Sequence, residues 1–424
     1  MGCGGGGGIV GDDNNNGNND GGGDDGGGDI TVVEPEVGKP LPDWSEGCLD
    51  IHAINTGRGE SSLLIFPDGT TMLIDAASST IDENDDIPPP PLKPAGSDPA
   101  TTITNYVTHY IKAASGKLNY MMISHWHNDH VGGPPNTATM EIHPSREFIL
   151  CGATRVGTSI RVDKFIDRGT TYPKDMASAS SAVYNYMKFV NWAKTEYGST
   201  REEAVVGVTD QIVLKEYPKK YSKFTIRTFM SAGTVWTGAG TVTRNTFPAD
   251  INQVLAASFD ENKYSIAFHL KYGLFDFFTG GDLSYSNSSK WSWYNVETPV
   301  AALMPKVEVM KANHHGTGDC NSDLLLKAAK PDAVIIHTWR DVQPNLATVK
   351  RMFAASPDCN IFTTNMTEKN KKVLGASVTA QLRSMGGHTV VRVDPGGGQY
   401  NIYVLDDTDE NYVVQKIFGP YQCK

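Results

Sequence analysis

Short apolar runs bounded by turn residues begin after residue 47, and they predict β-strands. Residues 48–55 and 61–66 alternate between apolar and polar positions or run apolar, as strands do. Asp68-Gly69 follows the second run and leads into a third one at residues 72–74. A turn pair of this kind between two apolar runs is typical of a hairpin, so antiparallel strands are expected here.

Further apolar runs alternate along the chain with stretches of helical spacing. Strands are predicted at residues 118–123, 148–150, 212–214, 224–226, 265–272, 274–279, 307–310, 333–337, 361–362, 389–393 and 400–405. Helices are predicted at residues 101–114, 181–197 and 346–355. Because strands occur both in hairpins and with helices between them, the pattern predicts an α/β fold with mixed sheets.

The composition separates a low-complexity start from a folded remainder. The chain has 424 residues, of which 39% are hydrophobic, enough for a sizeable core. Residues 1–40 are mostly Gly, Asp and Asn, which predicts a disordered tether. The six aspartates before residue 30 supply −6 of the net charge of −11, which leaves −5 for the rest. That mild balance disfavours a general nucleic-acid coating protein, a class that is usually basic.

The remainder is expected to form one domain over residues 48–424. Residues 156–260 are less regular than the rest, and we expect an insertion around them that covers the mouth of the active site. Its aromatic residues are expected in the core more often than against a ligand. No apolar run is long enough to span a bilayer.

The first residues, Met1-Gly2-Cys3-Gly4, resemble the start of a mature bacterial lipoprotein. This resemblance predicts a lipid on Cys3, an extracytoplasmic location and contact with the membrane only through that lipid. Two alternatives remain, a cytoplasmic protein with an unusual tail and an acylated eukaryotic protein. Gly6 stands where the acylation motif has Ser or Thr. The six cysteines show no C-x-x-C spacing, and no obligate protein partner is evident.

Residues 124–133 hold the densest chemistry in the sequence. His125, His127, Asp129 and His130 form an H-x-H-x-D-H cluster directly after the apolar run at residues 118–123. Neutral imidazole and carboxylate groups suit divalent metals such as zinc. The alternative is a histidine-rich surface loop that binds metal by accident. The strand before the cluster and the Gly-Gly pair after it favour a built site.

Polar residues that can bind metal also follow three other apolar runs. Asp75 follows the third strand of the hairpin region, Asp282 follows residues 274–279, and His314-His315 follow residues 307–310. Each lies where a predicted strand ends. We therefore expect these residues to meet the histidine cluster at one edge of the fold.

The motifs together resemble the metallo-β-lactamase superfamily. The matching segments are 55–61, 73–76, 123–133, 279–282, 311–317 and Asn262 with Ser265. The similarity spans residues 48–405 and is closest to the hydrolase domain of ComEC/Rec2 DNA-uptake proteins, with phosphorylcholine esterases as neighbours. It implies a four-layer αββα sandwich with mixed sheets and two metal ions at one edge. The expected metal is zinc, and manganese is the alternative.

The resemblance also implies roles for individual residues. His125 and His127 would bind the first metal, Asp129 and His130 the second, and Asp282 would bridge both. One of His314 and His315 would join the second metal, because neighbours on an extended segment point opposite ways. His314 is the preferred ligand, and His315 would contact the substrate's oxyanion. Asp75 would orient the site from behind the ligands.

One departure from the family pattern concerns the first metal. Most members supply a third histidine before the bridging aspartate, and here Asn262 occupies that region. His143 and His269 are the other candidates, and each is more typical of an ordinary packed or surface histidine. Asn262 or water would then complete the first metal. Arg58 also replaces a residue that is usually Gln.

The implied activity is hydrolysis. Two metals would lower the pKa of a bridging water, and the resulting hydroxide would attack phosphorus or a carbonyl carbon, with Asp129 positioning it. A ligand set without Cys disfavours a β-lactamase. The first hypothesis is a phosphodiesterase acting on nucleic acid or on another small or polymeric phosphoester. The alternatives are a lactonase or amidase-type hydrolase and a non-catalytic surface binding module.

Overall fold

The computed structural model describes residues 1–2, 33–78, 90–134, 141–170, 182–256, 260–285 and 291–424. The chain divides into two compact units, Met1–Val32 and Val33–Lys424. Of the first unit only Met1 and Gly2 are described, so Cys3 and most of the predicted tether lie outside the described residues.

One sheet of nine strands carries the hairpin region. It contains β1 (Leu49–Ala53), β2 (Ser62–Ile65), β3 (Thr71–Ile74), β4 (Leu118–Ile123), β5 (Val162–Asp167), β6 (Thr200–Glu203), β16 (His388–Val393), β17 (Gln399–Leu405) and β18 (Val414–Gln422). The strand order is β18-β17-β16-β1-β2-β3-β4-β5-β6. Pairing is antiparallel from β18 to β3 and parallel from β3 to β6.

A second nine-stranded sheet repeats this mixture. It contains β7 (Phe224–Ser231), β8 (Thr234–Trp236), β9 (Thr243–Asn245), β10 (Ala267–Tyr272), β11 (Phe275–Thr279), β12 (Val309–Lys311), β13 (Ala333–Ile336), β14 (Asn360–Thr363) and β15 (Ser384–Met385). The order is β15-β14-β13-β12-β11-β10-β7-β8-β9, with parallel pairing from β11 to β15.

The helices are short and several carry clear start signals. They are α1 (Pro99–Ile111), α2 (Gly152–Ser159), α3 (Ala182–Tyr197), α4 (Ile251–Ala256), α5 (Glu297–Ala301), α6 (Asp323–Ala329), α7 (Leu346–Ala355), α8 (Glu368–Leu374) and α9 (Ala376–Thr379). Single turns occur at η1 (Asn128–Gly132), η4 (Glu261–Tyr264), η5 (Ser292–Tyr294) and η6 (Asn313–Gly316). Helix α1 begins where the Asp98 side chain accepts the Ala100 and Thr101 N–H groups and Pro99 sets the first φ.

The main core lies between the two sheets. Alternate residues of β1, such as Ile51, pack there with residues of the second sheet, such as Phe268 and Phe277. The next residue of β1, His52, points to the opposite face of the sheet, where its Nδ1 is 2.9 Å from the Tyr106 hydroxyl of α1. Helices therefore cover the outer face of the first sheet.

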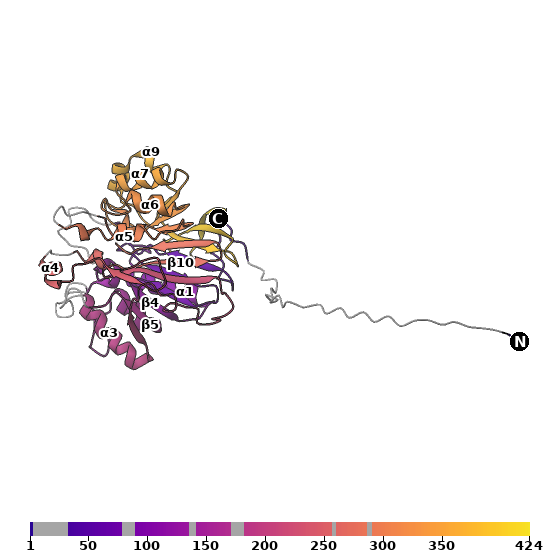
Figure 1. Ribbon diagram of the computed structural model, residues 1–424, viewed down its shortest axis with the longest axis horizontal. Coiled ribbons are helices and arrows are strands. Elements are labelled where there is room, and N and C mark those ends of the chain that lie inside the picture. The colour runs from indigo at the N-terminus through magenta and orange to yellow at the C-terminus, as the bar shows by residue number, and fades with distance from the viewer. Residues whose placement is uncertain (3–32, 79–89, 135–140, 171–181, 257–259, 286–290) are drawn as a thin grey trace. The chain divides into compact units, whose positions relative to one another are not determined.

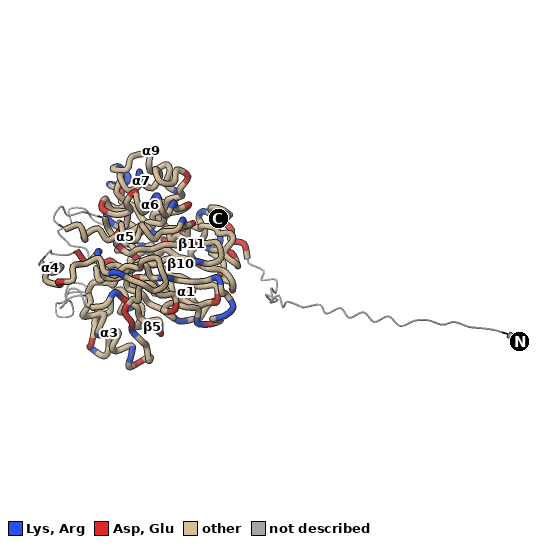
Figure 2. Tube along the Cα trace, in the orientation of Figure 1, with Lys and Arg blue, Asp and Glu red and all other residues tan. Residues whose placement is uncertain are grey.

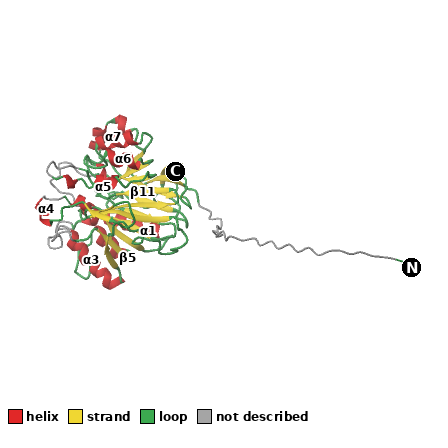
Figure 3. Cartoon of the chain, viewed as in Figure 1, coloured by secondary structure: helices red, strands yellow, loops and turns green. Residues whose placement is uncertain are grey.

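A second core covers the other sheet. Met310 and Val334 of the second sheet share a buried cluster with Leu326 of α6 and Val349 of α7. Figures 1 and 3 show the strands in the middle, with α5, α6 and α7 on one side and α3 on the other. The predicted α/β class with mixed sheets is confirmed, since both sheets contain parallel and antiparallel pairs.

Most predicted elements form, but two predicted strands do not. Residues 148–150 contribute only an isolated bridge between Ile142 and Ile149. Residues 212–214 form no strand, because the backbone of Val213 bonds to a side chain instead: Tyr120 Oη donates to its carbonyl (2.9 Å) and accepts from its N–H (3.1 Å). A short buried run alone does not distinguish these cases from a strand.

The stretch predicted as an insertion contributes to both sheets. Within residues 156–260, β5 and β6 extend the first sheet and β7 to β9 extend the second. At the start of the folded unit, the Gly38 N–H donates to Val414 O and the Val414 N–H to Lys39 O, both at 2.8 Å. Residues 38–39, at the end of the predicted tether, therefore belong to the second unit and pair with the start of β18.

Acidic and basic residues are interspersed along the loops and helices of the folded unit (Figure 2). One buried pair stands apart from these surface charges. Arg392 donates to Asp50 from Nε (2.9 Å) and Nη2 (2.7 Å), and both side chains are almost inaccessible. Among the described residues, no helix has the length and hydropathy needed to cross a membrane.

Candidate metal centre

The predicted ligands meet because parallel strands present their C-terminal ends at one edge. Asp75 follows β3 and the histidine cluster follows β4, which is parallel to β3. In the second sheet, Asp282 follows β11 and His314 follows the parallel strand β12. Ligand sites of α/β sheets commonly form at such carboxyl ends.

A carboxylate from β3 holds the start of the histidine cluster. Ser124 donates to Asp75 Oδ1 from its backbone N–H (2.7 Å) and to Oδ2 from its hydroxyl (2.7 Å). Asp75 has a φ of +59°, in the left-handed region that non-glycine residues rarely adopt. A strained backbone conformation of this kind persists only where surrounding contacts stabilise it, and such conformations are frequent at functional sites.

The loop before β2 approaches the cluster so closely that it needs glycine. Glu60 N–H donates to the carbonyl of Asp129 (2.8 Å). At Gly59, with φ +128°, an added Cβ would lie 2.2 Å from that same carbonyl oxygen. A side chain here would push the loop away from the cluster, which explains the glycine in the motif at residues 55–61.

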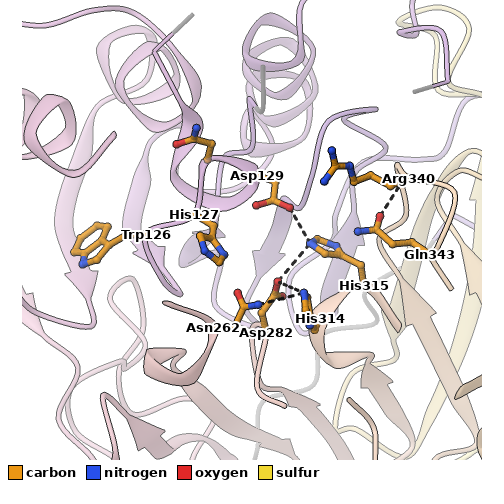
Figure 4. Close-up of a pocket in the computed structure, with 10 residues that line it drawn as sticks. Trp126, His127, Asp129, Asn262, Asp282, His314, His315, Arg340 and Gln343 are labelled. Atoms are coloured by element: carbon orange, nitrogen blue, oxygen red, sulfur yellow. Dashed lines mark hydrogen bonds and ion pairs between the residues drawn. The ribbon is translucent and has the colours of Figure 1, made fainter. Parts of the chain in front are cut away.

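Four imidazole rings surround one carboxylate oxygen, Oδ2 of Asp282. Their Nε2 atoms lie at 3.2 Å for His130, 3.5 Å for His315, 3.9 Å for His125 and 4.0 Å for His314. Figure 4 shows His314 and His315 with their rings towards Asp282. Two of the rings follow β4 of the first sheet and two follow β12 of the second, so the site joins both sheets.

Each of the four rings is held by its outer nitrogen. The Nδ1 partners are Ser124 Oγ for His125 (3.1 Å), Asp75 Oδ2 for His130 (2.7 Å), Asp319 Oδ1 for His314 (3.1 Å) and the His337 carbonyl for His315 (3.0 Å). A hydrogen bond that holds Nδ1 directs the Nε2 lone pair inward, as in metal-binding histidines. Asp75 thus takes the orienting position expected of it.

The backbone of the His314-His315 pair is left-handed, with φ of +44° and +50°. The expectation that only one ring would face the site assumed extended backbone, and this segment is not extended. Asn321 supports the turn by accepting the Asn313 N–H (2.9 Å) and donating to the Asn313 carbonyl (3.0 Å). Both histidine rings consequently face Asp282.

The remaining predicted residues lie around this cluster. Asp129 Oδ2 is 3.2 Å from His315 Nε2. His127 is partly exposed, and its Nδ1 is 3.2 Å from His125 Nε2. The amide Nδ2 of Asn262 donates to His314 Nε2 (3.2 Å), so Asn262 reaches the centre by way of that ring.

The charges of the cluster act in opposite directions on its members. Burial would raise the pKa of Asp282, but the neighbouring His130 and His315 hold it well below its usual range. Burial would lower the pKa of His130, but the carboxylates of Asp282 and Asp75 raise it well above normal. For His125, burial and the nearby His130 lower the pKa well below normal. One imidazole is therefore driven to carry charge beside another that is kept neutral.

The donor atoms fit divalent metal ions. His125, His130 and Asp282 offer one group of ligand atoms within 4.8 Å of one another, and Asp129, His130 and His315 offer another. Within the described part of the chain, His130 Nε2, His315 Nε2 and Asp282 Oδ1 are buried without a hydrogen-bond partner. Buried polar atoms normally have partners, so these three point to bound cations as the missing ones.

The other two histidines considered for the first metal lie elsewhere. His143 Nδ1 is 2.9 Å from Ser145 Oγ, and its ring stacks on Phe148. His269 Nε2 is 2.6 Å from Asp276 on the second sheet. Arg58 donates to the carbonyls of its own loop and of Pro90.

A cavity of about 350 Å³ opens onto the cluster. Its lining residues are Trp126, His127, Asn128, Asp129, Asn262, Asp282, His314, His315, Arg340 and Gln343. In Figure 4, Arg340 and Gln343 flank the side of His315 that faces away from Asn262. Neither was predicted from the sequence, although both follow β13 as the other site residues follow their strands.

A buried ion pair supports the underside of the site. Lys311 Nζ donates to Glu60 Oε2 and to the Gly281 carbonyl, both at 2.8 Å. The pair joins β12 to the loop before β2, directly next to Asp282. It was also missed, because a lysine inside a strand gives no indication of its partner.

No protein-family profile matches the sequence, and no curated protein does. Among solved structures, the chain is similar to a candidate metal-dependent hydrolase from Parabacteroides distasonis, with 12% identity, a TM-score of 0.33 and coverage of 74% of this chain and 92% of that one. It is also similar to a variant of the CmlA β-hydroxylase, with 10% identity, a TM-score of 0.37 and coverage of 84% of this chain and 55% of that one. The chain thus spans about half the length of the second protein. Likenesses at these scores assign neither a family nor an activity.

Proposed function

We propose that the chain is a binuclear metal-dependent hydrolase whose centre is built around Asp282. The observation that carries the proposal is the convergence of four imidazole Nε2 atoms on one buried carboxylate oxygen, at 3.2–4.0 Å. Histidines that served only for packing would not be expected to have all four Nδ1 atoms hydrogen-bonded while the Nε2 atoms of His130 and His315 stay buried without a partner. Zinc is the cation that this nitrogen and oxygen donor set suits best, with manganese the alternative.

Two ligand sets would share Asp282. His125 and His127, whose facing nitrogens lie 3.2 Å apart, would hold the first metal. Asp129, His130 and His315 would hold the second, because their donor atoms already lie within 4.8 Å of one another. The sequence favoured His314 as a ligand of the second metal. We instead assign His314 to the first metal, where it would supply the third imidazole.

When bound, two divalent cations activate water as a nucleophile and stabilise the negative charge that develops on the attacked group. The protein residues prepare this chemistry. Asp129 lies at the cavity wall, where its carboxylate can orient water or accept a proton. The nearby imidazoles of His315 and His130 outweigh burial and lower the pKa of Asp129, which keeps the carboxylate ionised.

The cavity favours an anionic substrate, and we propose a phosphoester. Arg340 contributes a permanent positive charge to the lining, and its guanidinium lies 4.8 Å from the centre of the Trp339 ring. Gln343 holds this loop by accepting the backbone N–H groups of Trp339 (3.0 Å) and Arg340 (3.1 Å). A lactone or amide carries no charge that would use a cation there.

The two helix-covered sheets with ligands at one edge also support the proposal that the fold is the four-layer metallo-β-lactamase sandwich. A lipid anchor on Cys3 with an extracytoplasmic location stays a proposal from the sequence, since Cys3 lies outside the described residues.

The proposal is tested by metal analysis together with a substrate screen. Purified protein should bind two equivalents of zinc or manganese and hydrolyse bis(p-nitrophenyl) phosphate. Chelation should abolish the activity and re-addition should restore it. His127→Ala should reduce both metal content and turnover. Hydrolysis confined to lactones or amides would redirect the proposal to carbonyl chemistry, and less than one equivalent of metal would favour a binding module.

A further inference from the structure

A buried ion pair beside the cavity joins the two halves of the site. Arg168, just after β5, donates to Glu261 of η4 through Nε to Oε1 and through Nη2 to Oε2, both at 2.7 Å. The Arg168 side chain is fully inaccessible, and that of Glu261 is 10% exposed. Two parallel hydrogen bonds between planar groups fix the relative orientation of both side chains.

The same carboxylate also holds the histidine cluster. Glu261 Oε1 accepts the backbone N–H of Trp126 at 2.9 Å. Trp126 is the residue between His125 and His127, so this contact acts on the middle of the H-x-H segment. The indole is fixed in turn, because its Nε1 donates to the Gly169 carbonyl (3.2 Å).

Glu261 is flanked on both sides by residues that reach the centre. The next residue, Asn262, donates to His314 Nε2 (3.2 Å). The preceding residue, Asp260, has its Oδ1 4.0 Å from His127 Nε2. One carboxylate therefore sets the distance between the histidine cluster of the first sheet and η4, which precedes β10 of the second.

We propose that Glu261, held by Arg168, is a positioning residue that sets the affinity of the first metal site. This inference rests on the proposed binuclear centre. The pair lies beside His125 and His127 but contacts none of Asp129, His130 or His315, which would hold the second metal. Removing the Arg168–Glu261 pair is therefore expected to lower the metal affinity of the first site and to leave that of the second unchanged. Mutation of a residue that holds a metal ligand in place typically lowers the metal affinity by about 10–100-fold.

The test compares metal binding by wild type and Glu261→Gln, by stepwise titration with cobalt(II) followed through its absorption spectrum. Wild type should bind two equivalents. The variant should bind the second-site ion as wild type does, while the dissociation constant for the first site rises at least about tenfold. His127→Ala identifies the first site, and adding Glu261→Gln to it should leave the remaining ion unaffected.

Two further variants guard against loss of folding. Glu261→Asp keeps the charge but is too short to reach both Arg168 and the Trp126 N–H, and it should show the same selective weakening. Asp50→Asn breaks a bidentate buried pair with Arg392 of the same geometry, away from the cavity. It should lower stability and leave both metal affinities unchanged.

The outcomes separate the two proposals. If wild type binds no metal, the proposed centre is wrong. If wild type binds two ions and the Glu261 variants weaken both equally, or neither, the centre stands and the positioning role is wrong.

Discussion

Two buried polar clusters of this molecule contain histidines and carboxylates, yet the pKa of His130 in one is shifted in the opposite direction to those of His52 and His388 in the other. In the candidate metal centre, neighbouring carboxylates raise the pKa of His130 well above normal. In the cluster under α1, burial lowers the pKa of His52, and burial lowers that of His388 to about 4. Aromatic rings of Tyr106 and Tyr412 pack around these imidazoles.

The difference lies in where the positive charge comes from. Under α1, the bidentate contact from Arg392 satisfies Asp50, so the cluster is balanced by its own residues. In the centre, Lys311 pairs with Glu60 and leaves Asp282 to the imidazoles. A buried carboxylate that relies on titratable rings suits a bound cation, whereas one that has an arginine suits a scaffold.

The strongest test of this contrast removes one aspartate from each cluster. Asp282→Ala should release metal from both sites and reduce turnover at least about 1,000-fold, since a bridging ligand supplies several kcal/mol of catalysis. Asp50→Asn should keep metal and activity but lose about 3–5 kcal/mol of stability, because Arg392 stays buried without its partner. Metal analysis, kinetics and urea unfolding measure the three quantities. Loss of metal in Asp50→Asn would remove the distinction.

A smaller effect is expected from the neutral His388. Its folded pKa of about 4 lies below the ordinary 6.5, so the unfolded chain binds more protons between these values. The stability that His388 contributes is complete above pH 6.5 and declines as the pH falls towards 4. His388→Gln, which can still accept the Asn55 N–H, should remove about 2–3 kcal/mol of the difference in unfolding free energy between pH 7 and 4.5. Urea unfolding of both proteins in chelator measures this difference. An unchanged pH profile would show that His388 is protonated as readily in the folded state.

The smallest effect concerns the substrate. Arg340→Met should lower kcat/KM for an anionic phosphodiester about tenfold, equivalent to about 1.4 kcal/mol, and leave a neutral ester unaffected. Lys369→Met is the matched control. Lys369 pairs with Asp341 at 3.4 Å and does not line the cavity, so this substitution removes one positive charge without changing the cavity wall. Equal losses for both esters would assign Arg340 to the fold instead of to substrate charge.

Local patterns were sufficient for most of the strands and for the histidines and aspartates that gather at the candidate metal centre. Runs such as residues 118–123 fixed β4 at its observed bounds, because a short apolar stretch between turns has few alternatives to a buried strand. The same reasoning failed at residues 212–214, where a hydroxyl from Tyr120 satisfies the backbone. Hydrogen-bond partners that are distant in sequence leave no local pattern.

The sequence by itself determined the chemistry of the centre: the H-x-H-x-D-H cluster, Asp75, Asp282 and His314-His315, each after a strand. Tertiary structure alone decided how these side chains are used. Left-handed backbone turns both His314 and His315 inward, and parallel pairing in two separate sheets brings all four rings to one oxygen. Arg340, Lys311 and Glu261 became visible only in three dimensions, because a charged side chain acquires its role from the partner that folding places beside it.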